Sequence, residues 1–191
     1  MRLPLIAPGD LEPDQRALYD DFRDEIARDF KGFIAVDEAT GALIGPFNAW
    51  VRAPRWGKSI WELVKSVSMD PVLPRTVREV AILVTGAHFR SAYEIYAHVA
   101  MAENRGLDDS KLATIVAGQR PGSLTRDEGI AYDVASALVS GHLLPALTYR
   151  QAVEAFGADG AMELIYLVGV YCFVSVTLNG FDVRVPEDAS E

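Results

Sequence analysis

Hydrophobic positions recur every three or four residues along most of the chain, which is the spacing that places them on one face of an α-helix. After Pro13, for example, Leu18, Phe22 and Ile26 follow at four-residue intervals. Residues 33–46 differ, because β-branched and aromatic residues flank a Thr-Gly turn and predict either a small hairpin or an ordered loop. The pattern therefore predicts an all-α bundle of roughly seven to nine helices.

Proline and glycine mark the expected helix ends. Pro54 predicts a break between two helices, and Pro74 predicts the start of another that ends near Gly86. A further helix is expected from about Ser91, with Gly106 as a typical stop signal. Two capping boxes predict later helix starts, Thr125 with Glu128 and Thr148 with Gln151.

The composition is that of a globular protein, with 50% hydrophobic and 24% charged residues among 191. The net charge of -9 favours neither nucleic acid nor an anionic membrane as a partner, because both attract clustered Lys and Arg. The N-terminal residues lack the apolar core of a secretory signal, so we expect a cytoplasmic location.

Residues 161–178 form an apolar run of about the length that a bilayer requires. Glu163, Ser175 and Thr177 interrupt this run, and no Lys or Arg cluster flanks it, so we expect a helix buried on all sides, with another subunit covering one of its faces. Cys172, the single cysteine, lies in this run and is expected to be a buried, inert thiol.

Polar residues, among them Glu79, His88, Ser91, Glu94 and His98, interrupt the apolar segment 79–107. Ser91, Glu94 and His98 lie within about 60 degrees of arc on one helix face. Glu79 belongs to the preceding helix, and antiparallel packing of the two helices would bring it toward this face. A histidine beside a carboxylate in an apolar pocket suits proton transfer, whereas a solvated Glu-His pair would contribute only a few tenths of a kcal/mol. The apolar neighbours favour the first interpretation.

Other chemistries find less support in the sequence. We expect no metal, because the Glu-x-x-His pairs of di-iron bundles and the His-x-x-x-His pattern are absent. Ser91 and His98 are two helical turns apart, roughly 10 Å along a helix axis, which is too far for a direct bond between a nucleophile and its base. No glycine-rich phosphate loop occurs, so no cofactor is expected. His88 is expected to satisfy a helix end.

The order Glu79, eleven residues, Ser91, two residues, Glu94, three residues, His98 resembles the carboxymuconolactone decarboxylase family of the alkyl hydroperoxidase D-like superfamily. The segments on either side are similar too, so the resemblance covers most of residues 43–185. It implies the superfamily's all-α bundle.

The sequence shows no long linker and no sharp change of composition that would divide it into domains. We expect a single domain over residues 1–191, in which residues 1–42 form an N-terminal helix and extension and residues 43–185 form the family core. Members of the superfamily form dimers, trimers or hexamers with active sites near subunit contacts, so a homo-oligomer is expected.

In the decarboxylase branch, the resemblance implies a cofactor-free lyase that decarboxylates a small carboxylated lactone or related acid. His98 would be the acid or proton shuttle, Glu94 would set its protonation, and Glu79 would orient the pair or move water. Ser91 would donate a hydrogen bond to the substrate. The resemblance leaves open whether four other side chains touch a substrate: Arg78, Arg90, Tyr93 and Tyr96.

Two alternatives remain open at this point. In the hydroperoxidase branch, cysteines occupy the positions of Ser91 and Glu94, and a hydroxyl and a carboxylate cannot replace them in thiol redox chemistry. A peroxiredoxin-like antioxidant function is therefore disfavoured. The other alternative is a non-catalytic oligomeric binding protein of the same fold.

Overall fold

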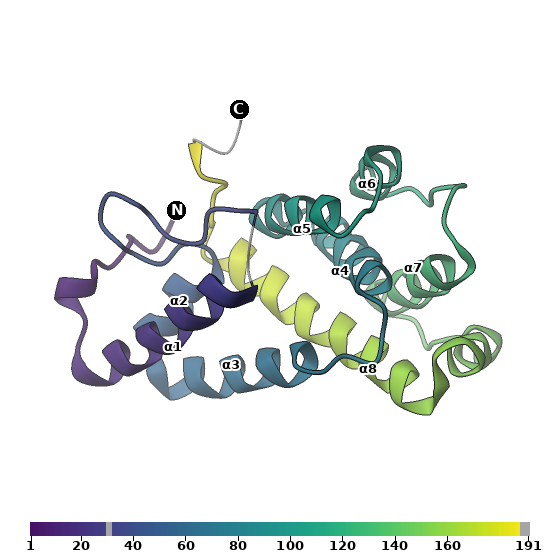
Figure 1. Ribbon diagram of the computed structural model, residues 1–191, viewed down its shortest axis with the longest axis horizontal. Helices are drawn as coiled ribbons and strands as arrows, with labels where there is room; N and C mark the ends of the chain where they lie inside the picture. Colours follow the sequence, from purple (N-terminus) through teal and green to yellow (C-terminus); the bar gives the residue numbers. More distant parts are fainter. Residues whose placement is uncertain (30–31, 188–191) are drawn as a thin grey trace.

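The computed structural model describes residues 1–29 and 32–187, and these residues form eight α-helices and one short 3-10 helix (Figure 1). No strand occurs among them, so the predicted all-α fold is confirmed. The helices are η1 (Pro8–Asp10), α1 (Pro13–Asp29), α2 (Pro46–Arg52), α3 (Pro54–Ser68), α4 (Arg75–Phe89), α5 (Ala92–Asn104), α6 (Asp109–Val116), α7 (Arg126–Val139) and α8 (Ala146–Gly180).

The helices form two groups joined by α8. Figure 1 shows α1, α2 and α3 on one side and α4 to α7 on the other, with the yellow-green α8 crossing between them. Helix α4 contacts α5, α6, α7 and α8, while α8 also contacts α2 and α3. Since α4 is buried along ten consecutive residues from Val77 to Gly86, it forms the centre of the second group.

Several helix ends lie where the sequence predicts them. The single residue Ala53 separates α2 from α3 just before Pro54, and Pro74 is the N-cap of α4. Gly106 takes the left-handed conformation (φ 89°) after α5, and the capping box of Thr125 is present at the start of α7. Local sequence chemistry therefore determines these boundaries.

Two predicted boundaries are wrong. Helix α4 continues past Gly86 to Phe89, because Arg90 takes the left-handed conformation (φ 51°) that ends the helix. Helix α8 begins at Ala146 with Pro145 as its N-cap, so Thr148 lies inside the first turn and caps nothing. In both places a neighbouring residue provides the helix end instead.

Helix α8 is 35 residues long and is kinked at Gly157, whose φ of 73° lies outside the helical region. By length and composition it is the one helix among the described residues that is apolar enough to cross a membrane, but half of its apolar window is buried inside the fold, as in a core helix. Contrary to the expectation of burial on all sides, Tyr166 and Phe173 are exposed, so one face is uncovered within this chain.

Residues 33–45 form an ordered loop with a single antiparallel bridge between Val36 and Leu43, and not a hairpin of two strands, while Pro46 begins α2. Two tyrosines of α5 hold this loop. The Tyr93 hydroxyl donates to the Ile34 carbonyl, and the Ile34 amide donates to the Tyr96 hydroxyl, both at 2.8 Å. The loop is thereby fixed against the helix that carries Glu94 and His98.

Candidate active site

Glu79 of α4 and His98 of α5 form a buried hydrogen-bonded pair. The Nδ1 atom of His98 lies 2.9 Å from Glu79 Oε2, and the Glu79 side chain is fully buried. Arg105, just beyond the end of α5, forms an ion pair with the other Glu79 oxygen. With Arg105 paired to the other oxygen of this group, His98 donates its Nδ1 hydrogen to Glu79. The structure therefore brings together two residues that the sequence predicted would meet.

The second histidine nitrogen faces another carboxyl group. His98 Nε2 lies 3.3 Å from Glu94 Oε1, one helical turn away on α5. This oxygen makes no hydrogen bond with the described residues, so the contact is a close charge pair. Burial raises the pKa of Glu94 to about 7, with a smaller increase from Glu79, while His98 acts in the opposite direction. Near neutral pH, Glu94 is therefore available both as an acid and as a base.

Burial alone would lower the pKa of His98, but the negative charges of Glu79 and Glu94 outweigh burial and raise the pKa above its ordinary value. Arg105 acts in the lowering direction. The edge of the Tyr171 ring on α8 packs against the imidazole, with the ring centroids 5.0 Å apart. Since burial strongly raises the pKa of Tyr171, this hydroxyl keeps its proton.

Gly86 allows α4 and α5 to approach each other beside Glu94. A Cβ atom at Gly86 would lie 3.3 Å from Glu94 Cγ and 3.6 Å from Ile95 Cγ1, although the residue is an ordinary helical one. The missing side chain at this helix crossing therefore sets the position of the Glu94 carboxyl group.

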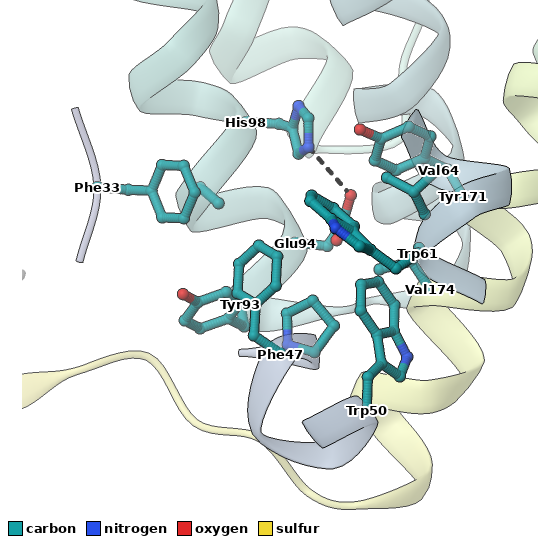
Figure 2. Close-up of a pocket in the computed structure, with 12 residues that line it drawn as sticks. Phe33, Phe47, Trp50, Trp61, Val64, Tyr93, Glu94, His98, Tyr171 and Val174 are labelled. Carbon is teal, nitrogen blue, oxygen red and sulfur yellow. Dashed lines mark ion pairs between the residues drawn. The ribbon is translucent and has the colours of Figure 1, made fainter. Parts of the chain in front are cut away.

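Glu94 and His98 line a small apolar cavity, here called the aromatic cavity (Figure 2). Its volume is about 40 Å³, which is room for a few water molecules or for one end of a small molecule. No lysine or arginine lines it. Figure 2 shows the dashed contact between His98 and Glu94 with aromatic rings around it. The aromatic residues are Phe33, Phe47, Trp50, Trp61, Tyr93 and Tyr171.

A larger hollow lies on the other side of the same histidine. It has a volume of about 400 Å³ and is here called the arginine cavity, because Arg28, Arg75, Arg78 and Arg105 line it. Glu79 lines the arginine cavity, and His98 and Tyr171 line both cavities. The imidazole therefore lies between an apolar compartment and a charged one.

Ser91 is the N-cap residue of α5 and is fully buried. Its hydroxyl makes no hydrogen bond with the described residues, and it lines neither the aromatic nor the arginine cavity. Its predicted contact with a substrate therefore stays a prediction.

The structure also places residues whose roles the sequence left open. Arg78 forms a buried ion pair with Glu163 of α8. Arg90 and His88 line a separate hollow between α4, α6 and α7, away from His98. The hydroxyl of Tyr93 is used to hold the loop before α2 while its ring faces the aromatic cavity.

The sequence did not indicate Arg105, nor the aromatic residues around Glu94 other than Tyr93. Arg105 lies seven residues after His98, which is two helical turns on the same face. Helical spacing could therefore have predicted that Arg105 lies on the side of His98. The meeting of Trp50 and Trp61 with Glu94 depends on packing between distant helices, and no local pattern indicates it.

Metal and thiol chemistry have little support in the donor groups. Within residues 1–29 and 32–187, no group of three His, Cys, Asp or Glu side chains is arranged to hold a metal ion. Cys172 is half-buried on α8, and burial raises the pKa of its thiol, which keeps it in the less reactive protonated form.

These helices have the alkyl hydroperoxidase D-like fold, which confirms the fold that the resemblance implied. One similar solved structure is an alkylhydroperoxidase AhpD core, an uncharacterized peroxidase-related protein from Ralstonia eutropha JMP134. It has a TM-score of 0.76 and 14% identity, and the match covers 98% of this chain and 93% of that chain.

The debrominase Bmp8 is another similar structure. A cysteine-to-alanine variant in complex with 2,3,4-tribromopyrrole has a TM-score of 0.72 and 11% identity, over 99% of this chain and 94% of that chain. The apo form has a TM-score of 0.67 and 13% identity, over 87% and 90%. No family model and no curated protein matches the sequence. At these identities the likeness establishes the fold alone.

Proposed function

We propose that the protein is a cofactor-free acid-base catalyst, a carbon-carbon lyase that decarboxylates a small carboxylated lactone or related acid. One observation carries the proposal: the Glu94 carboxyl group, with a pKa of about 7, lines the aromatic cavity and lies 3.3 Å from the Nε2 atom of His98. The resemblance of the Glu79, Glu94 and His98 spacing to the decarboxylase branch supports the choice of reaction.

The proposed reaction needs one proton at carbon. Breaking the bond to the carboxylate releases carbon dioxide and leaves the electron pair in a conjugated dienolate. Glu94 and His98 share an acidic proton and deliver it to the carbon. Glu79 and Arg105 hold the imidazole in place, and the arginine cavity gives the pair access to protons from water.

Turnover of carboxymuconolactone in D2O tests this function. We expect carbon dioxide release, one deuterium in the product, and loss of both in the His98→Ala variant. His142→Ala is a matched control, because His142 is exposed in the connection before α8. Turnover that survives in His98→Ala at the rate of His142→Ala would refute the proposed role.

A second candidate function is binding of a small neutral planar ring without turnover. The aromatic cavity supports it, since six aromatic residues and no lysine or arginine line the hollow. The similar debrominase Bmp8 was solved with 2,3,4-tribromopyrrole, which is such a ring. Stabilisation of the protein by 2,3,4-tribromopyrrole, with no product from either this ring or carboxymuconolactone, would favour binding over catalysis.

A peroxidase function has less support, although one similar structure is described as peroxidase-related. Ser91 and Glu94 occupy the positions at which the hydroperoxidase branch carries cysteines, and Cys172 is half-buried. We expect no peroxide turnover. Turnover that persists in Cys172→Ser would reveal a route that does not depend on a thiol.

The proposal includes a cytoplasmic homo-oligomer. Residues 164–181 contain no charged side chain, and the exposed part of α8 includes apolar residues at intervals of four, seven and three residues, which lie on one helix face. A dimer, trimer or hexamer would bury this face. The exposed residues of this α8 face are Met162, Tyr166, Phe173 and Val176.

A further inference from the structure

The arginine cavity concentrates cationic side chains in a chain whose net charge is -9. Its arginines come from three places in the fold: Arg28 from the end of α1, Arg75 and Arg78 from the start of α4, and Arg105 from the end of α5. With a volume of about 400 Å³, the hollow has room for a small organic molecule.

Not all of these cations are fully engaged by protein groups. Arg78 and Arg28 form ion pairs with glutamates. Arg105 pairs with Glu79, but its side chain is 25% exposed, and one contact leaves most of the five guanidinium donors free. Arg75 is exposed, and its guanidinium makes no ion pair with a residue that the structure describes.

The charge of the hollow favours a singly charged ligand. Three acidic residues, Glu25, Asp70 and Glu79, line it together with the four arginines. A carboxylate matches the planar fork of an arginine and carries one negative charge, whereas a phosphate dianion would face stronger repulsion from these acids. We propose that the arginine cavity binds the carboxylate group of a small organic acid, with Arg75 and Arg105 as its binding groups.

This inference deepens the proposed function, since it assigns a place to the charged end of the substrate. A carboxylate in the aromatic cavity would meet no lysine or arginine, and that cavity measures only about 40 Å³. In the arginine cavity, the same group lies beside Glu79, His98 and Tyr171. The bound organic acid therefore reaches the imidazole of His98 from the arginine cavity.

Binding of benzoate tests the inference without any turnover. The imidazole signals of His98 can be followed by NMR during titration with benzoate, with the neutral molecule benzamide as a control of the same shape. We expect benzoate to shift the His98 signals in the wild-type protein and benzamide to leave them unchanged. In Arg75→Gln, benzoate should bind about tenfold more weakly, through loss of one charged contact.

Arg126→Gln is the matched variant, because Arg126 is an exposed arginine of α7 that does not line the cavity. Equal benzoate affinity in Arg75→Gln and Arg126→Gln would overturn the inference, as would equal shifts with benzamide. Tighter binding of inorganic phosphate than of benzoate would overturn the assignment to a carboxylate. Benzoate binding without lactone turnover would uphold this site and refute the proposed reaction, while turnover without benzoate binding would do the reverse.

Discussion

The Nδ1 atom of His98 lies 2.9 Å from Oε2 of Glu79, although the two residues are 19 positions apart and lie on different helices. Both side chains are buried. Removing a carboxylate from water is costly, and the fold offsets this cost through His98 and Arg105. A buried charge network of this kind is unusual where only stability is needed, and it supports an acid-base role.

The first prediction concerns the pKa of His98. Its value should lie above 6.5 in the wild-type protein and fall in Glu79→Gln, because the negative charge that favours the imidazolium is removed. NMR titration of the three histidines measures this directly. Glu154→Gln is the control, since Glu154 forms an exposed ion pair elsewhere. A His98 pKa that is the same in both variants would contradict the arrangement described.

The same shift predicts a dependence of folding stability on pH. Because the pKa of His98 is raised in the folded state, its stabilising contribution is complete below the unfolded value of about 6.5 and is lost as the pH rises through the folded value. Glu94 also titrates in this range, so the comparison is made with Glu94→Gln present in both proteins. Denaturation between pH 5 and pH 9 should then show the loss when His98 is present, but not in His98→Gln.

The second prediction concerns Glu94, whose raised pKa acts in the opposite sense. The pKa of Glu94 is 4.5 in the unfolded state and about 7 in the folded state. The unfolded state therefore ionises first, and the free energy of unfolding falls as the pH rises between these values. At pH 8, Glu94→Gln should be more stable than wild-type protein by up to about 3 kcal/mol, and near pH 4 the difference should vanish. Urea denaturation at both pH values measures it.

A catalytic cost should accompany this gain in stability. Glutamine cannot donate or accept the proton, so turnover of carboxymuconolactone by Glu94→Gln should fall by about 10² to 10⁴-fold. A variant that is more stable at pH 8 and still fully active would show that Glu94 is a buried acid without a catalytic role.

The third prediction concerns Gly86. Alanine generally stabilises a helix by about 1 kcal/mol relative to glycine, but here its Cβ would lie 3.3 Å from Glu94 Cγ. We expect Gly86→Ala to have nearly unchanged stability and about tenfold lower turnover, since the carboxyl group must shift. Gly129→Ala of α7 is the control, because its nearest contact is the flexible end of Arg120. Gly129→Ala should keep full activity.

The fourth prediction concerns assembly. Phe173→Glu places a charge on the exposed apolar face of α8 and should convert an oligomer into monomers. Leu143→Glu is the control, because Leu143 is 93% exposed and lies outside this face. Sedimentation equilibrium of both variants measures the change. If the wild-type protein is monomeric at all concentrations, the predicted subunit contact through α8 is wrong.

The sequence predicted the parts of the fold that depend on neighbouring residues. The breaks at Pro54 and Gly106 follow from backbone chemistry, and the spacing of Glu94 and His98 on one helix follows from helical geometry. The end of α4 was predicted wrongly because Arg90, a residue without a strong preference for the left-handed conformation, adopts it.

The candidate site was only partly predictable, because part of it depends on contacts between segments far apart in the sequence. Glu79 could be expected near His98 because a short turn joins their helices. The aromatic cavity forms where Phe33, Trp50 and Trp61 meet from a loop and two helices. No local sequence pattern predicts this contact between distant segments. Arg105 lies two helical turns after His98, so helical geometry alone places it on the same face.

Tyr93 and Tyr96 hold the loop of residues 33–45 through hydrogen bonds to Ile34. This loop contributes to the cavity wall but carries none of the acid-base groups. The acid-base groups lie on α4 and α5, while Phe33 of the loop forms part of the cavity wall. Substitutions at Phe33 therefore change the shape of the cavity while Glu79, Glu94 and His98 stay in place. Under the proposed function, this one short segment is where a change of substrate preference needs the fewest substitutions.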